Sequence, residues 1–154
     1  MACSATFVPT PPRLSELMGG DHNDLDERWT RLQTTPASDR AARRELFESF
    51  RTDLLRHIEI EEKELFPRIV ETDPAQRGLV ERLQEEHLRI QETLRRLAEA
   101  VDTGRGVPED LAAQLIEVLW DHNAREEAWA YPWLDEHLTH EQVLVIRDEL
   151  AHHG

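Results

Sequence analysis

The chain has almost no cysteine, no long apolar run and a shortage of basic side chains. Its single cysteine, Cys3, excludes an intrachain disulfide and fits a reducing compartment. No apolar stretch of roughly 18 residues occurs, and the opening residues lack the basic and apolar regions of a secretory signal. Lys and Arg number 18 against 32 Asp and Glu, and the net charge of −14 argues against nucleic acid and anionic membrane surfaces as partners. We therefore expect a soluble, cytoplasmic protein that binds neither.

Proline, glycine and capping residues divide the 154 residues into helical segments. Apolar residues recur every three to four positions in each segment, as they do on amphipathic helices, and no segment alternates with the period of a strand. The predicted helices cover about 14–33, 39–66, 74–102, 108–136 with a kink near Pro132, and 139–151. Short loops make consecutive helices antiparallel, so we predict an all-α fold, an up-down-up-down four-helix bundle.

The chain length suits one domain. We expect a flexible lead-in at 1–13, the bundle at 14–137, and a short fifth helix with a tail at 138–154.

A repeat of 65 residues relates the two halves of the predicted bundle. HIEIEEKELFP (His57 to Pro67) and HNAREEAWAYP (His122 to Pro132) share one pattern: His, three residues, Glu-Glu, three residues, an aromatic, Pro. His22 and His87 are also 65 residues apart, in similar surroundings. The bundle therefore reads as one helical hairpin written twice, and each of its four helices contributes one histidine.

All four histidines lie on the apolar stripe of their helix: His22, His57, His87 and His122. The last of them, for example, shares its stripe with Leu115, Trp129 and Trp133. Counted from the turns at a rise of about 1.5 Å per residue, three of the histidines reach one level of the bundle within about 3 Å, while the match for the first-helix histidine is looser. In each H-x3-E pair the glutamate, Glu61 or Glu126, follows by about one turn and can reach the same point.

Burying two glutamates and four histidines costs too much free energy unless their charges are compensated. The only basic side chain obviously near this face is Arg125, so we predict a pair of divalent cations. Imidazole and carboxylate without thiolate suit iron, manganese or zinc. A single histidine on an apolar stripe is usually a core residue, but four at related depth, two with a glutamate one turn on, favour a metal centre. The neighbouring glutamates point away from the stripe and are expected to face solvent: Glu59, Glu62, Glu85 and Glu127.

These motifs resemble the hemerythrin-like (HHE cation-binding) domain over about Leu14 to His137. The resemblance implies a four-helix bundle around a non-heme diiron centre, bridged by two carboxylates and an oxo or hydroxo group. It implies terminal ligands at His22, His57, His87 and His122, and bridging ligands at Glu61 and Glu126. Oxygen-carrying members place a further histidine four residues after the third-helix histidine, where this chain has Gln91. The repeat counterpart, Asp26, could ligate a cation or accept a hydrogen bond from a ligand imidazole.

Four histidines rather than five leave two exchangeable positions, which favours an enzyme over a carrier. The leading hypothesis is a diiron oxidoreductase that acts on O2 or hydrogen peroxide, as an oxidase or oxygenase for a small molecule or as a peroxidase- or catalase-like enzyme. Its chemistry belongs to the metal, and Trp29, Phe50 and Trp129 would keep the pocket dry. A non-catalytic module that binds O2, NO or iron for sensing, carriage or storage is the alternative, and a purely structural metal site is a third.

The predicted fifth helix also carries an apolar stripe, formed by Val143, Ile146 and Leu150. This stripe could bind a partner or a second copy of the chain, so a homodimer is one expected state.

Overall fold

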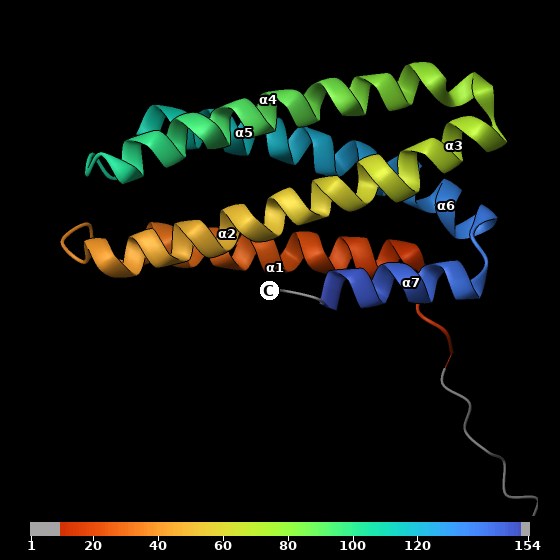
Figure 1. The fold of residues 1–154 in the computed structure, drawn as a ribbon, viewed down its shortest axis with the longest axis horizontal. Helices are drawn as coiled ribbons and strands as arrows, with labels where there is room; N and C mark the ends of the chain where they lie inside the picture. The colour runs from red at the N-terminus through yellow and green to blue at the C-terminus, as the bar shows by residue number, and fades with distance from the viewer. Residues whose placement is uncertain (1–9, 152–154) are drawn as a thin grey trace, which may run out of the picture.

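The computed structural model describes residues 10–151, and every regular element in that range is a helix (Figure 1). The helices are α1 (Leu14–Thr34), α2 (Arg40–Ile60), α3 (Phe66–Thr72), α4 (Arg77–Asp102), α5 (Glu109–Arg125), α6 (Tyr131–His137) and α7 (His140–Ala151), with a 3₁₀ helix (Pro74–Gln76) before α4. The predicted all-α class is confirmed. Cys3 and most of the predicted lead-in lie outside the described residues. Among the helices of residues 10–151, none combines the length and apolar character that crossing a membrane requires.

The long helices lie side by side, and the chain reverses at alternate ends of the molecule. In Figure 1 the α1–α2 and α4–α5 turns lie at one end, and the turn from α3 to α4 lies at the other. The closest helix pairs are α1 with α2 and α4 with α5, which are the two repeated hairpins. In the α4–α5 turn, Gly104 and Gly106 have φ of 77° and 72°, a region that glycine enters without steric cost.

Two five-residue π-helices interrupt the helices that carry the H-x3-E motifs. Glu61–Leu65 joins α2 to α3, and Glu126–Ala130 joins α5 to α6. The helix expected to stop at about residue 66 therefore continues to residue 72, and the one expected to kink near residue 132 has its irregular turn just before that proline. In a π-helix the backbone hydrogen bonds join residue i to i+5. Accordingly, the amides of Phe66 and Tyr131 donate to the carbonyl oxygens of Glu61 and Glu126.

The π-helix shifts the buried face by one position. Trp129 and Trp133, expected on the stripe of His122, are only half-buried. Beyond Glu126, the side chains buried in the core are instead those of Ala130, Tyr131 and Leu134, each with no exposed surface. The predicted stripe was therefore wrong beyond Glu126, because an ideal α-helical period does not hold across a π-helix.

Apolar side chains form two clusters with a layer of buried polar residues between them. The first apolar cluster includes Leu25, Phe50, Ile90 and Leu119. The second apolar cluster includes Met18, Leu65, Leu83 and Ala130. On α1 and α4, His22 and His87 separate residues of one cluster from residues of the other. His57 and His122 lie where the first cluster gives way to the second along the other two chain segments, although Ile58 of the first cluster follows His57. The core is thus divided at the level where the histidines lie.

The C-terminal helix α7 packs against α1 and α2. Its start is capped reciprocally, since the Gln142 amide donates to Thr139 Oγ1 and the Thr139 amide donates to Gln142 Oε1. Its apolar stripe belongs to the second cluster, with exposures of 6%, 3% and 9% for Val143, Ile146 and Leu150. The chain itself covers this stripe, which the sequence suggested as a surface for a partner or a second copy, and the homodimer stays a prediction.

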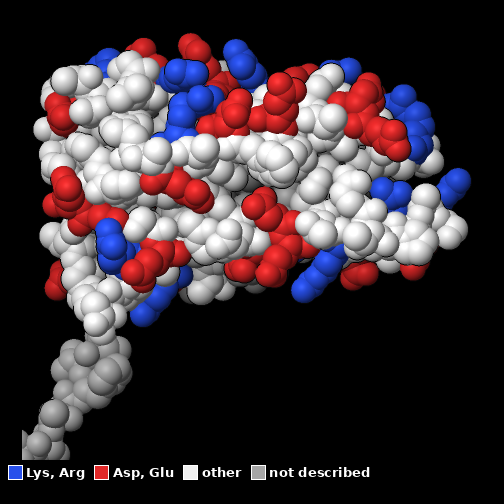
Figure 2. All heavy atoms as spheres, turned by 180° about the vertical axis from the view of Figure 1, so that it is seen from behind, with Lys and Arg blue, Asp and Glu red and all other residues white. Residues whose placement is uncertain are grey.

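The surface carries charge of both signs. On the face that Figure 2 shows, acidic and basic side chains are interspersed. The net charge of −14 is therefore not collected into one acidic field on this face.

Candidate metal centre

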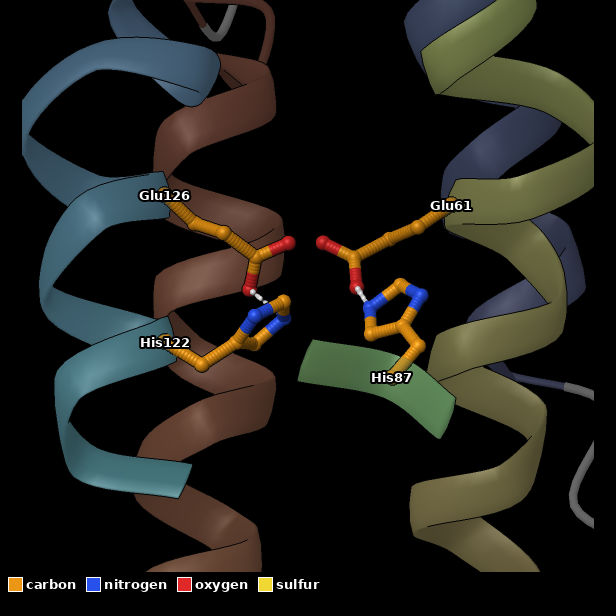
Figure 3. Close-up of side chains that lie close together, drawn as sticks. All are labelled: Glu61, His87, His122 and Glu126. Atoms are coloured by element: carbon orange, nitrogen blue, oxygen red, sulfur yellow. Dashed lines mark hydrogen bonds and ion pairs between the residues drawn. The ribbon is translucent and has the colours of Figure 1, made fainter. Parts of the chain in front are cut away.

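Four imidazoles and two carboxylates meet in the polar layer. The histidines come from four helices, and the glutamates are the first residues of the two π-helices: His22, His57, His87, His122, Glu61 and Glu126. None of the six is more than 3% exposed. Figure 3 shows Glu61 and His87 facing Glu126 and His122 from separate helices, with their donor atoms turned inward. The structure therefore brings together the four histidines and two glutamates that the repeat singles out, including His22, whose predicted depth matched the others least well.

The donor atoms form two groups that share one carboxylate. Glu61, His87, His122 and Glu126 make one group, and His22, His57 and Glu126 make the other, with the donor atoms of each group within 4.8 Å of one another. Glu126 Oε1 lies 3.1 Å from His122 Nε2 and 3.4 Å from His22 Nε2. Glu61 Oε1 lies 3.1 Å from His87 Nε2 and 3.5 Å from His57 Nε2. Both carboxylates thus lie between an imidazole of one hairpin and an imidazole of the other.

These separations suit metal ligands. Donor atoms bound at about 2.1 Å to one cation lie about 3.0 Å apart in an octahedral site and about 3.4 Å apart in a tetrahedral one. The observed spacings of 3.1–3.5 Å fall at these values. Among the described residues, His122 Nε2 and Glu126 Oε2 are also buried without a hydrogen-bond partner. Buried polar atoms normally have a partner, and a cation would supply one here. The residues therefore fit a pair of cations.

The outward nitrogen of each of the four histidines of the centre contacts a further acidic residue, and we call these four acidic residues the outer carboxylates. The Nδ1–oxygen distances are 2.7 Å for His57–Asp21, 2.7 Å for His87–Glu62, 3.0 Å for His22–Glu127 and 3.2 Å for His122–Glu86. A carboxylate that accepts the Nδ1 proton fixes the tautomer that leaves the Nε2 lone pair directed at the centre.

Two of the outer carboxylates had been expected to face solvent. Glu127 is exposed, as expected, with 49% of its side chain accessible, whereas Glu62 is partly buried at 32%. Each nevertheless accepts a hydrogen bond from a buried imidazole, a role that the sequence did not predict. Glu59 and Glu85 do face solvent, and Glu59 pairs with Lys63. The signal that could have found the outer carboxylates is the repeat, which matches Asp21 with Glu86 and Glu62 with Glu127.

Arg125, the basic residue singled out beside the stripe, does not enter the centre. Its guanidinium donates two hydrogen bonds to Glu86, one of them at 3.2 Å from Nε. Burial raises the pKa of Glu86, but the hydrogen bonds from Arg125 and His122 outweigh this effect and lower it. Glu86 therefore stays charged while it holds His122.

Without a cation, the pKa values of three of the buried groups are shifted far from their ordinary values. Burial, followed by the charge of Glu61, raises the pKa of Glu126 to about 8. Burial lowers the pKa of His87, yet its hydrogen bonds to Glu61 and Glu62 raise that pKa to about 9. At His122, burial and the charge of His87 outweigh the effects of Glu61 and Glu86 and lower the pKa to about 4. Cations that bind at neutral pH must therefore displace protons from Glu126 and His87.

One residue of the centre, Tyr131, was not predicted from the sequence. Its side chain has no exposed surface, and its hydroxyl donates to Glu61 Oε2 at 2.8 Å. The same oxygen lies 3.1 Å from His22 Nε2 and 3.2 Å from Glu126 Oε1. The available signal was the aromatic residue before proline in both copies of the repeat.

The remaining sequence-predicted residues lie outside the two donor groups. Asp26 and Gln91 are exposed, and the structure does not bring them to the centre. Trp29 packs against Phe50 with ring centroids 5.0 Å apart, and both belong to the first apolar cluster. Trp129 is half-buried against the second apolar cluster.

Taken together, the fold and the centre define a helical protein that can hold cations between histidines and carboxylates in its core. Residues 13–134 match the hemerythrin HHE cation binding domain, so the chain belongs to this family. No curated protein and no solved structure shows significant similarity to the chain. The resemblance seen in the motifs is thereby confirmed.

Replacing Asp21 by asparagine should weaken cation binding about 10- to 100-fold, the usual effect of losing an acidic partner that orients a ligand histidine. An amide can still contact His57 Nδ1, but it no longer carries the charge that stabilises the bound imidazole. Competition with a chromophoric chelator measures the affinity. Asp26→Asn removes an equal charge from an exposed position of the same helix and should leave the affinity unchanged. Equal weakening in both variants would show that only net charge matters.

Proposed function

We propose that this protein is a non-heme diiron protein that binds and activates O2 or hydrogen peroxide, built as an up-down-up-down four-helix bundle of two repeated hairpins. The observation that carries the proposal is the pair of buried donor groups that share Glu126, each with two imidazoles. Imidazole and carboxylate donors without thiolate suit iron, and manganese or zinc would accept the same set. In this assignment His22 and His57 would hold one cation, and His87 and His122 would hold the other. Glu61 and Glu126 would each supply a carboxylate to both cations.

The surrounding chain prepares this site for redox chemistry. Bound iron would supply electrons and positive charge to a small oxidant. The outer carboxylates keep the four imidazoles oriented, and the two apolar clusters exclude water from both sides of the polar layer. Phe50, at 1% exposure, belongs to this apolar wall.

The closure of the site favours a small reactant. The four imidazoles and two carboxylates are between 0% and 3% exposed. A molecule the size of O2 or peroxide needs little opening of the chain to reach them, whereas a large organic substrate needs much. This closure supports O2 or peroxide as the reactant.

The test begins with metal content and an optical spectrum of the aerobically purified protein, for which we expect two irons per chain, one for each donor group. The iron-loaded protein is then mixed with peroxide, and sustained turnover, as O2 evolution or oxidation of a reducing co-substrate, is the expected result. A spectral change that reverses when O2 is added and removed, without turnover, would assign the site to carriage or sensing. A colourless zinc protein would contradict the redox proposal.

The metal-free and metal-loaded proteins should respond to pH in opposite directions. Between pH 6.5 and about 8 the folded metal-free chain retains protons on Glu126, with a pKa of about 8, and on His87, with a pKa of about 9. In the unfolded chain these groups titrate near 4.5 and 6.5, so the folded state binds more protons and loses stability as the pH rises. Each such proton changes the free energy of unfolding by up to about 1.4 kcal/mol per pH unit. His122, whose pKa is lowered to about 4, acts in the opposite sense mainly below pH 6.5.

In the loaded protein, rising pH removes the protons that compete with the cations, so stability should rise over the same interval. Urea unfolding with chelator and with iron measures both slopes. Parallel slopes would show that the cations do not bind at these groups.

A further inference from the structure

We propose that Tyr131 is the seventh ligand of the centre: its phenol oxygen binds the cation held by His22 and His57, so that the two cations differ chemically. This inference rests on the metal centre of the proposed function, and it adds a ligand that the histidine and glutamate motifs do not contain.

The position of the phenol oxygen carries the proposal. It lies 3.1 Å from His22 Nε2, 3.2 Å from His57 Nε2 and 3.2 Å from Glu126 Oε1. The two imidazole nitrogens are themselves 3.1 Å apart. His22 Nε2 lies 3.4 Å from Glu126 Oε1, so the five contacts among these four donor atoms span 3.1–3.4 Å, close to the edge of about 3.0 Å expected for ligands of one octahedral cation. The phenol oxygen occupies one corner of that site.

The repeat shows that this ligand has no counterpart in the other half of the centre. Tyr131 corresponds to Phe66, 65 residues earlier. Phe66 is fully buried and stacks on the ring of His87, with centroids 5.3 Å apart and an interplanar angle of 16°. The ligand histidines, the bridging glutamates and the outer carboxylates are each matched by a residue of the same chemical type. The hydroxyl of Tyr131 therefore adds an oxygen to one half only.

The backbone delivers both aromatic side chains in the same way. Each follows a π-helix and lies five residues after a bridging glutamate, to whose carbonyl its amide donates. Residues five apart are neighbours on a π-helix. Tyr131 lies nine residues after His122. In an ideal α-helix, at about 100° per residue, its side chain would therefore point to the face opposite that of His122. The π-helix Glu126–Ala130 thus places the phenol in the centre.

Ligation changes the charge at this half of the centre. The hydroxyl proton is now shared with Glu61 Oε2 at 2.8 Å. When the oxygen binds a cation, the O–H bond is replaced by an oxygen–metal bond and the proton leaves to solvent. The resulting phenolate fills a position that would otherwise exchange, so a small reactant is directed to the cation of His87 and His122. The seventh ligand therefore decides which half of the centre is reactive.

Tyr131 is the only tyrosine of the chain, which makes a phenolate signal unambiguous. The protein is loaded with Zn²⁺ and with Fe³⁺, and its metal content is measured in each case. We expect a near-ultraviolet phenolate difference band with Zn²⁺ and a visible phenolate-to-iron charge-transfer band with Fe³⁺. Both should be lost in Tyr131→Phe, which should still bind two cations but hold one of them at least about tenfold more weakly. A fully loaded wild-type protein without either band would overturn the proposal.

The outcomes separate this inference from the function on which it rests. If no cation binds, the metal centre itself is wrong; if two bind without a phenolate band, only the role of Tyr131 is wrong. Tyr131→Phe is suited to the test, because phenylalanine already occupies the matched position Phe66. In the reverse variant, Phe66→Tyr, a second phenolate band is expected from the half that holds His87.

Discussion

Replacing Glu126 by glutamine should abolish the binding of both cations and leave the metal-free fold intact. Glu126 is the one residue present in both donor groups, so its carboxylate contributes to both sites. An amide of the same shape lacks the negative charge, and we expect each affinity to fall by more than about 100-fold, beyond the effect of losing an orienting partner. Metal analysis after gel filtration, together with chelator competition, measures the loss.

In the metal-free protein the same substitution should not lower the free energy of unfolding. Burial and the charge of Glu61 raise the pKa of Glu126 to about 8, which means that its charged form is disfavoured in the folded chain. Glutamine removes that charge, so the free energy of unfolding in chelator should be unchanged or higher. His122→Ala, which removes a ligand of one group only, is the matched variant and should retain one cation. Retention of two cations by Glu126→Gln would contradict the shared bridge.

Removing the cations from the wild-type protein should lower its melting temperature by about 8–16 °C or more. A cation present at about a thousand times its dissociation constant stabilises the folded state by about 4 kcal/mol. For a chain of this size each kcal/mol corresponds to about 2–4 °C. The second cation adds to the effect. Thermal unfolding followed by circular dichroism, with iron and with chelator, measures the difference.

The control for this experiment is Glu126→Gln, whose melting temperature should not respond to chelator because it holds no cation. The helical content of the wild-type protein at low temperature should be similar in both conditions, since the apolar clusters contain residues from every long helix. A melting temperature that is independent of chelator in a protein shown to bind two cations would place those cations outside the core.

Sequence patterns predict which histidines and glutamates meet in the core, because α-helical spacing holds up to the first residue of each π-helix. His57 and Glu61, four positions apart, lie on one regular helix and its junction, and the same is true of His122 and Glu126. The level of the histidines follows from the rise per residue between turns. The spacing of the ligand residues and their distance from a turn are both set within a single helix, so they can be predicted from the sequence.

What could not be predicted depends on departures from α-helical spacing or on neighbouring helices. Tyr131 and Ala130 face the core only because a π-helix precedes or contains them, and no pattern of apolar residues predicts this wider turn. An outer carboxylate such as Glu62 lies about 100° from its bridging neighbour and appears solvated on an isolated helix. Only the position of His87 on another helix shows that it accepts a hydrogen bond.

The layer of histidines and glutamates between the two apolar clusters has a consequence for the protein in a cell. Chains synthesised while their cation is scarce have an interior divided by uncompensated charge, so they will unfold more often and expose both clusters to proteases. Small changes in the population of unfolded chains alter steady-state abundance several-fold. The amount of this protein should therefore follow the supply of its metal.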